Sequence, residues 1–247
     1  AQAFVTAGNT GMAMYFATKT FGLIPGVIRP CLCATFPVKN GKCVILDIGA
    51  NAECRPEFLV QFGRMGSVYA ALLLKREHPR VGLLANGEEE GKGNELVKAA
   101  GPLMRAEVPG FVGNIEGKEL FAGEVDVAVT DGFTGNIFFT PDESASRLSQ
   151  DVMGEEIRRR PNSMVGGVMI KGALKRVKAR MDDSEYGGAV LLGLSVIVVV
   201  AHGKSKANAV QNAIRVAKQG VESDLPAKIE MAVAQDKVHA PLVAAVA

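Results

Sequence analysis

The sequence has little excess charge and no long uninterrupted hydrophobic run. The formal net charge is only +2 over 247 residues, which argues against a protein built wholly around nucleic acid. The longest apolar run, Ala189–Ala201, is interrupted by Gly193 and Ser195, and it is shorter than the roughly 20 residues that span a bilayer. The first residues show no basic segment of a secretory signal. We therefore expect a cytoplasmic globular protein without an export signal.

Patterns that bind metals are also missing. The four cysteines, Cys31, Cys33, Cys43 and Cys54, lie in one quarter of the chain, and no histidine lies near them to complete a common zinc site. We expect reduced, partly buried thiols, no metal site and no cofactor.

Common catalytic motifs are absent as well. The chain contains no Gly-x-Ser-x-Gly elbow, no His-Glu-x-x-His and no dinucleotide fingerprint in a strand-to-helix turn. Catalysis by a serine nucleophile and hydrolysis by a metal are therefore not favoured.

What is present is an alternation of strand and helix patterns in a chain that is 48% hydrophobic. Strands are predicted at Ala1–Thr6, Cys31–Phe36, Cys43–Ile48, Val81–Ala85, Phe111–Asn114, Val125–Thr130 and Ile197–Ala201. Helices are predicted at Met12–Phe21, from Pro56 to Leu73, from Glu95 onward, at Lys118–Phe121, Ser205–Val221 and Pro226–Val233. The pattern predicts a single α/β domain over residues 1–247, with a mostly parallel sheet and helices on its faces.

The loop from Asn86 to Asn94 is the most informative stretch. It contains three glycines, two asparagines and Lys92, and it lies between a predicted strand and a helix that begins at Glu95. Its backbone can bend closely around a ligand, and Lys92 and the positive end of the helix can both face an anion. The loop therefore suggests a phosphate site. Its spacing taken alone favours a solvated loop with a capped helix.

Polar residues follow six of the predicted strands. They are Asn9 and Thr10, Asp47 and Asn51, Asn86 with Lys92 and Asn94, Asn114, Asp131 with Asn136, and His202. Ligands of parallel sheets bind beyond the carboxyl ends of the strands, so we expect these groups to converge at one edge. Each can instead form a turn or a helix cap, and that interpretation is the better one for Asn51 and Asn114 taken singly.

Amides, one lysine and one histidine without a nucleophile fit the direct attack of a bound anion on an activated acyl group. Lys92 and the asparagines would hold the anion and stabilise an oxyanion. His202 would donate a proton to the anion or to a leaving thiolate, or it is a hydrogen-bonded structural histidine.

Residues 147–181 differ from the rest of the chain. They include nine basic and three acidic residues, a net charge of +6, with an apolar stripe repeating every four residues from Met169 to Met181. Candidate surface residues are Arg158, Lys171, Leu174, Lys175, Arg176, Val177 and Lys178. This helical excursion either docks an acidic partner or anionic lipid, or packs on the core with a solvated basic face.

Several motifs stand in an order that resembles the PlsX-type phosphate acyltransferases. They are Ala7-Gly8-Asn9-Thr10-Gly11, Leu46-Asp47-Ile48-Gly49-Ala50-Asn51, Gln61-Phe62 with Met65-Gly66-Ser67-Val68-Tyr69, Gly87-Glu88-Glu89-Glu90-Gly91-Lys92-Gly93-Asn94-Glu95, Asp131-Gly132-Phe133-Thr134-Gly135-Asn136, Ser184-Glu185-Tyr186-Gly187-Gly188-Ala189 and Ala201-His202-Gly203. The resemblance covers nearly the whole chain to about Val221.

The resemblance implies acyl transfer from acyl carrier protein to inorganic phosphate, which gives an acyl phosphate for phospholipid synthesis. It implies a Rossmann-like three-layer fold akin to phosphotransacetylases and isopropylmalate dehydrogenases, a homodimer and peripheral attachment to a membrane. Lys92 and Asn136 match active-site positions of the family. Residues 147–181 fall where the family places membrane-facing and dimer-forming helices.

The chain departs from the family pattern in places. The opening strand and the acidic glycine-rich loop of the family are absent, which suggests an N-terminally incomplete chain. Pro141 and Lys204 also depart from the usual sequence. Two other functions remain open: a phosphotransacetylase-like enzyme that uses acyl-coenzyme A, and a non-catalytic fragment that binds a membrane or a carrier protein.

Overall fold

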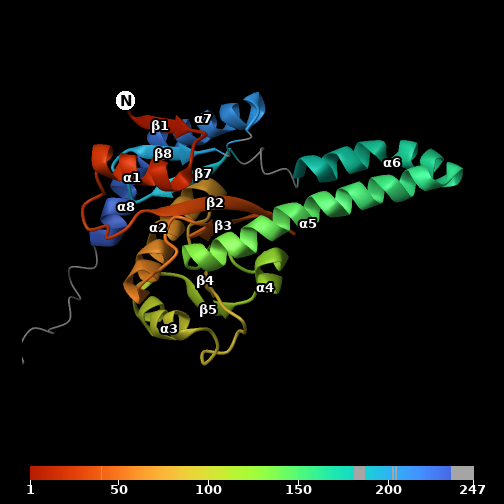
Figure 1. The fold of residues 1–247 in the computed structure, drawn as a ribbon. Coiled ribbons are helices and arrows are strands. Elements are labelled where there is room, and N and C mark those ends of the chain that lie inside the picture. Colours follow the sequence, from red (N-terminus) through yellow and green to blue (C-terminus); the bar gives the residue numbers. More distant parts are fainter. Residues whose placement is uncertain (40, 181–186, 202, 204, 235–247) are drawn as a thin grey trace, which may run out of the picture.

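A computed structural model describes residues 1–39, 41–180, 187–201, 203 and 205–234, without the side chains of residues 140–147, 178 and 180. Its centre is an eight-stranded sheet in the order β1-β8-β7-β2-β3-β6-β4-β5 (Figure 1). The strands are β1 Ala3–Thr6, β2 Cys31–Val38, β3 Gly41–Leu46, β4 Val81–Leu84, β5 Phe111–Ile115, β6 Val127–Val129, β7 Ala189–Leu192 and β8 Ile197–Val200.

The sheet is mixed. Parallel pairing joins β3 to β6, β6 to β4, β4 to β5 and β1 to β8, whereas β8–β7, β7–β2 and β2–β3 are antiparallel. Three reversals separate β8 from β3. The pair β1 and β8 therefore runs opposite to the group β3, β6, β4 and β5.

Helices cover both faces of the sheet. They are α1 Thr10–Phe21, α2 Pro56–Leu74, α3 Glu95–Glu107, α4 Gly117–Ala122, α5 Gly132–Arg159, α6 Pro161–Arg180, α7 Ala207–Glu222 and α8 Leu225–Ala234. Side chains of α2, α3, α7 and α8 share one core cluster with the sheet. Side chains of α1, α4 and α5 pack in two clusters on the other face. This three-layer arrangement confirms the Rossmann-like α/β class.

The long helix α2 lies against the middle of the sheet. Pro56 occupies its first turn, where no intrahelical donor is needed, and its buried face includes Phe58, Phe62 and Met65. A Cβ atom on Gly66 would come within 2.6 Å of Leu46 Cδ1. The glycine therefore permits the close contact of helix and sheet that its position inside a helix suggests.

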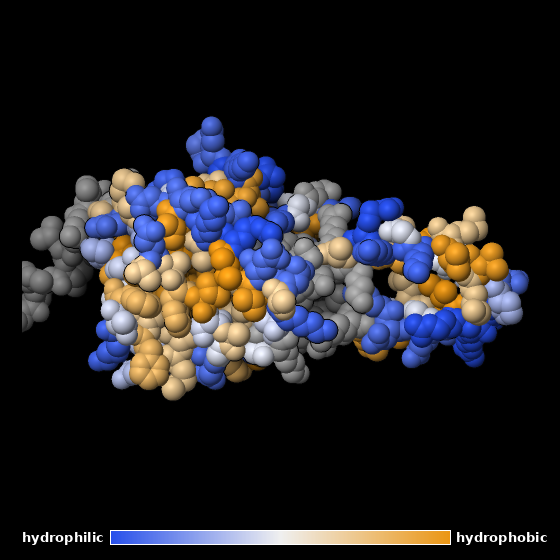
Figure 2. Space-filling model, turned by 90° about the horizontal axis from the view of Figure 1, so that it is seen from above, coloured by the Kyte–Doolittle hydropathy of each residue, from blue (hydrophilic) through white to orange (hydrophobic). Residues whose placement is uncertain are grey.

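Helices α5 and α6 form a hairpin that projects from the body, and we call it the helical arm (Figure 1). The arm includes residues 147–180 of the predicted excursion, whose last residue lies outside the description, and it begins earlier, because Asp131 caps α5 directly after β6. The arm exposes apolar side chains (Figure 2), among them Val168 at 74% and Met169 at 82% exposed. Within the part of the chain that the structure describes, no helix combines the length and hydrophobicity needed to cross a membrane.

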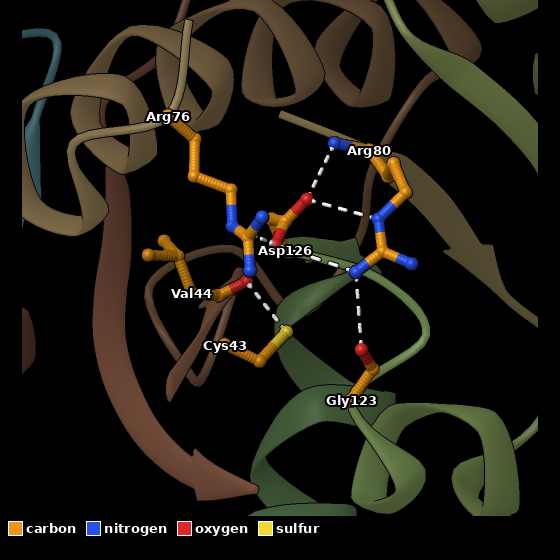
Figure 3. A network of polar contacts seen from close by, with 6 residues as sticks. All are labelled: Cys43, Val44, Arg76, Arg80, Gly123 and Asp126. Atoms are coloured by element: carbon orange, nitrogen blue, oxygen red, sulfur yellow. Dashed lines mark hydrogen bonds and ion pairs between the residues drawn. The ribbon is translucent and has the colours of Figure 1, made fainter. Parts of the chain in front are cut away.

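An ion-pair cluster lies at the edge where β4 and β6 begin (Figure 3). The carboxylate of Asp126, which is 3% exposed, accepts the backbone N–H of Arg80 at 2.9 Å and its Nε at 3.1 Å. Arg76 Nε lies 3.0 Å from the other carboxylate oxygen, and Arg80 also donates to the Gly123 carbonyl. Because Arg80 precedes β4 and Asp126 precedes β6, the cluster fastens these neighbouring strands together.

Candidate functional site

Four parallel strands, β3, β6, β4 and β5, end at the same side of the sheet, which we call the strand-end edge. The segments that leave this edge carry most of the predicted site: Asn51 after β3, Asp131 and Asn136 after β6, and Asn86, Lys92 and Asn94 after β4. Because β3, β6 and β4 are adjacent, these three segments are neighbours.

Asp47 organises the loop after β3, residues 47–51, which we call the Asp47 loop. Its Oδ1 accepts the N–H groups of Leu32 at 3.1 Å, Gly49 at 3.1 Å and Ala50 at 2.9 Å. Its Oδ2 accepts both the backbone N–H and the Nδ2 of Asn51 at 2.8 Å. The side chain is fully buried, which raises the pKa of the carboxyl group, while the hydrogen bonds from Ala50, Asn51 and Leu32 act in the opposite direction.

Asn51 joins the Asp47 loop to two neighbouring segments. Its Nδ2 donates to the Pro30 carbonyl at 2.8 Å, and its own carbonyl accepts the N–H of Gly132 at 2.8 Å. Both amide hydrogens of Asn51 therefore bind protein atoms, which supports the interpretation of Asn51 as a loop-forming residue. Direct contact with phosphate stays a prediction.

The N-terminus of α5 is built onto the Asp47 loop. Asp131 caps the helix, since its Oδ1 accepts the N–H groups of Phe133 at 3.0 Å and Thr134 at 2.8 Å. Asn136 Nδ2 lies 3.4 Å from the carbonyl of Ile48. A Cβ atom on Gly135 would lie 1.9 Å from the Asp47 carbonyl oxygen, so only glycine allows this approach. The positive end of a 28-residue helix therefore lies directly against the Asp47 loop.

The loop between β4 and α3, residues 85–94, is held in shape by asparagines. Asn86 Oδ1 accepts the N–H of Gly93 at 2.8 Å, and Asn94 caps α3 by accepting the N–H of Val97 at 2.9 Å. Asn114 Nδ2 donates to the Glu89 carbonyl at 3.0 Å and lies 3.5 Å from the Lys92 carbonyl. These contacts confirm the capped helix. Lys92 itself is exposed.

Two ion pairs hold the outside of this loop. Glu90 pairs with Arg105 of α3, and Glu88 Oε1 lies 2.8 Å from Lys118 Nζ of α4. The same ammonium lies 2.9 Å from Glu116 and 3.4 Å from Glu119, so these carboxylates raise the pKa of Lys118. The carboxylate oxygens of Glu88, Glu116 and Glu119 lie within 4.8 Å of one another, as in a cation site, and Lys118 supplies the positive charge there.

The predicted convergence of six strand ends at one edge is wrong for two strands. β1 and β8 run opposite to β3, so the segments after them leave the other side of the sheet. Asn9 follows β1 and caps α1 by accepting the Met12 N–H at 3.0 Å, and Thr10 is the first helical residue. His202, which follows β8, lies outside the described residues, and its catalytic role stays a prediction.

The sequence alone indicated only part of this construction. The central role of Asp47 has a signal, because an aspartate after a buried strand and before Ile-Gly-Ala-Asn is typical of a loop closed by a side chain. No sequence signal indicates the hydrogen bond from Asn114 to Glu89 or the ion pair of Lys118 with Glu88, because these contacts join segments that are distant in sequence.

Comparison with known proteins identifies the family of this chain. The family described as "Fatty acid synthesis protein" matches residues 1–228. The phosphate acyltransferase of Pelotomaculum thermopropionicum is 48% identical over 225 residues, covering 91% of this chain and 66% of that protein. The one from Helicobacter hepaticus is 44% identical over 233 residues, covering 94% and 70%. The chain thus spans about two thirds of the length of these relatives.

Solved structures share the fold at low sequence identity. A phosphotransacetylase from Streptococcus pyogenes superimposes with a TM-score of 0.59 at 16% identity, over 90% of this chain and 64% of that one. A branched-chain phosphotransacylase from Enterococcus faecalis gives 0.56 at 14% identity, over 90% and 74%. The resemblance inferred from the sequence is confirmed by the curated relatives. The chain belongs to the fatty acid synthesis protein family, and the relatives that it matches at 44–48% identity are named phosphate acyltransferases.

Proposed function

We propose that this chain transfers an acyl group from a thioester to inorganic phosphate at the strand-end edge. The observation that carries the proposal is the adjacency of three segments on β3, β6 and β4: the Asp47 loop, the N-terminus of α5 and the loop that carries Lys92. An exposed ammonium and side-chain amides can bind a phosphate, and the dipole of a helix N-terminus favours an anion beside it. The curated relatives named phosphate acyltransferase support the same reaction.

In the proposed reaction, an oxygen of bound phosphate attacks the thioester carbonyl carbon. A carbon–oxygen bond forms, the carbon–sulfur bond breaks, and the products are an acyl phosphate and a thiol. Lys92 holds the phosphate, while the side-chain amide of Asn136 and the dipole at the N-terminus of α5 stabilise the oxyanion of the tetrahedral intermediate. The hydrogenphosphate ion loses its proton in the attack, and that proton passes to the departing thiolate.

The proposed acyl donor is acyl carrier protein, and the product serves phospholipid synthesis. The family description "Fatty acid synthesis protein" supports a long-chain donor from that process. Acyl-coenzyme A is the alternative donor. Comparing turnover with the two donors at equal acyl chain length separates them.

The test is to incubate the chain with a thioester and phosphate and to trap acyl phosphate as its hydroxamate. Lys92→Met should lower kcat/KM by about 10²-fold, since loss of one charged contact to the reacting phosphate costs about that much. Lys98→Met, which removes an exposed lysine in α3, should leave it unchanged. Turnover that is independent of phosphate, or equal in both variants, would contradict the proposal.

The helical arm is the proposed surface for peripheral membrane contact. Arg158, Lys171, Lys175 and Arg176 are exposed, and so are the apolar Val177 at 56% and Met169 at 82%. Leu174 is half-buried, and the side chain of Lys178 lies outside the description. Apolar side chains beside basic ones suit an anionic bilayer surface.

Vesicle flotation tests this assignment. We expect binding to vesicles that contain phosphatidylglycerol, and loss of binding when Lys175 and Arg176 are both changed to Glu. The matched control changes Lys218 of α7 and Lys228 of α8 to Glu, since both lie outside the helical arm. Equal binding to neutral vesicles would contradict the proposed attraction between the basic side chains and the anionic lipid.

Sedimentation of the same variants tests the proposed homodimer, because a dimer built through the arm would dissociate.

A further inference from the structure

Two arginines beside the Asp47 loop share one aromatic ring. The guanidinium carbon of Arg55 lies 5.3 Å from the centre of the Phe58 ring, and that of Arg29 lies 6.0 Å from it. Phe58 is only 6% exposed and belongs to the main core, whereas both arginines are exposed. The ring thus attracts two positive groups at the surface.

The backbone that carries these arginines is also fixed. Gln61 of α2 accepts the Ile28 N–H at 2.9 Å and donates to the Gly26 carbonyl at 2.9 Å, which ties down the segment before Arg29. On the other side of Arg29, the carbonyl of Pro30 accepts a hydrogen bond from Asn51 Nδ2 at 2.8 Å. Arg55 directly precedes the first turn of α2, and its side chain caps nothing.

Neither guanidinium is paired with a carboxylate in the part of the chain that the structure describes. Other arginines in the same part do pair with carboxylates, including Arg64, Arg76 and Arg80. Two like charges gathered on one ring repel each other, so this arrangement is most favourable when an anion lies between them.

The pair belongs to the same side of the sheet as the proposed reaction. Arg29 comes just before β2, whose first residues lie beside the end of β3, and Cys54 Sγ donates to the Asn51 carbonyl at 3.5 Å. Burial raises the pKa of Cys54 to about 12, and the charges that act on this thiol include Asp47, Asp131 and Arg29. The arginines therefore lie beside both the Asp47 loop and the cap of α5.

The pair is nevertheless separate from Lys92. Arg29 precedes β2 and Lys92 follows β4, with β3 and β6 between them. Three strand spacings of about 4.8 Å place these segments roughly 14 Å apart across the sheet. The two groups can thus bind two anions at the same time.

We propose that Arg29 and Arg55 bind the phosphate of the thioester donor's 4′-phosphopantetheine arm. This inference rests on the proposed function, because an acyl donor of this kind carries a phosphate of its own, which is a second anion beside inorganic phosphate. Paired guanidinium groups suit a phosphodiester, because each can donate two parallel hydrogen bonds. The pantetheine arm then reaches from this pair towards the reacting phosphate at Lys92.

Calorimetric titration with 4′-phosphopantetheine and with pantetheine tests the inference without turnover. The chain should bind the phosphorylated compound at least about tenfold more tightly, as expected for charge-assisted hydrogen bonds. Arg29→Gln with Arg55→Gln should bring the two affinities together, and Lys228→Gln should leave the preference intact. Equal affinities for the unmodified chain would overturn the inference.

Kinetics separates this inference from the proposed function. If acyl transfer occurs, the double variant should raise KM for acyl carrier protein and for acyl-coenzyme A alike, because both carry this phosphate, with KM for inorganic phosphate unchanged. A rise confined to the carrier protein, or a rise in KM for inorganic phosphate, would overturn the inference. Absence of any turnover by the unmodified chain would refute the proposed function, and the calorimetric preference would still decide the inference.

Discussion

Two buried aspartates mark opposite edges of the same parallel strands, and their partners differ. Asp126, where β6 begins, is 3% exposed and is paired with the guanidinium groups of Arg76 and Arg80. Asp47, where β3 ends, is fully buried and accepts five N–H groups from Leu32, Gly49, Ala50 and Asn51, and no cation among the described residues pairs with it. One carboxylate neutralises nearby cations, and the other shapes a loop.

This difference separates a structural edge from the edge that we propose to bind phosphate. At the edge where strands begin, the positive charges of Arg76 and Arg80 are directed to Asp126 (Figure 3). At the strand-end edge, the carboxylate of Asp47 accepts hydrogen bonds from N–H groups. It therefore does not form an ion pair with Lys92 or with the exposed arginine pair. Cations that are left available beside a well-ordered loop are what an anionic substrate requires.

The largest expected effect is on stability at the structural edge. Asp126→Ala should lower the free energy of unfolding by about 3 kcal/mol, the low end for a broken buried ion pair, because both arginines can rehydrate. Glu124→Ala, which removes an exposed carboxylate nearby, should change it by less than about 0.5 kcal/mol. Urea unfolding measures both. Equal stabilities would mean that the Asp126 cluster does not hold the strands together.

The contact between α5 and the Asp47 loop is the next largest. Gly135→Ala should destabilise the chain by about 2 kcal/mol, because a Cβ atom there meets the Asp47 carbonyl oxygen. Gly101→Ala is the matched control: it lies inside α3 with no atom within 4 Å of its Cβ, so the change should stabilise by up to about 1 kcal/mol. Thermal unfolding gives both values. Two similar shifts would refute the close approach.

Alkaline pH probes the thiol beside Asp126. Burial, with the Asp126 charge as a second cause, raises the pKa of Cys43 from 9.0 to about 12. Between these values the unfolded chain releases the proton while the folded chain keeps it, so stability falls as pH rises, by up to about 1.4 kcal/mol per pH unit. Cys43→Ala should remove that part of the slope between pH 9 and pH 11 in urea titrations. An unchanged slope would show that this thiol does not contribute.

The smallest effect concerns the loop that carries Lys92. Lys118→Met leaves the carboxylates of Glu88, Glu116 and Glu119 facing one another and releases the outer tether of the loop. We expect KM for phosphate to rise about threefold at low salt, the size of effect typical of exposed ion pairs, and to recover at high salt. Lys98→Met should show neither change. A threefold change in kcat alone would argue against a positional role.

Much of the fold was predictable from local pattern. The alternation of apolar segments placed the strands close to their observed bounds, and Asn94 was recognisable as a cap. The directions of β1 and β8 were not predictable. They depend on the antiparallel pairing of β2 and β7, and the sequence of a short apolar strand does not show whether its neighbour runs parallel or antiparallel.

The candidate site was predictable to the extent that it follows strand ends. Lys92 and Asn136 are found on neighbouring segments, since they follow the adjacent strands β4 and β6. Arg29 and Arg55 were missed, because they meet only through the ring of Phe58, a contact that no spacing reveals. Side chains that meet across loops have no periodic signal, whereas those on one strand or helix do.

Residue-resolved NMR during a titration with inorganic phosphate tests the central claim most directly. Amide shifts should concentrate in the Asp47 loop, in residues 132–136 at the start of α5 and in residues 87–94 around Lys92, and Lys92→Met should weaken them. Amides near Arg76, Arg80 and Asp126 should not move. Shifts that concentrate at the Asp126 cluster or on the helical arm, with none at the strand-end edge, would contradict the account.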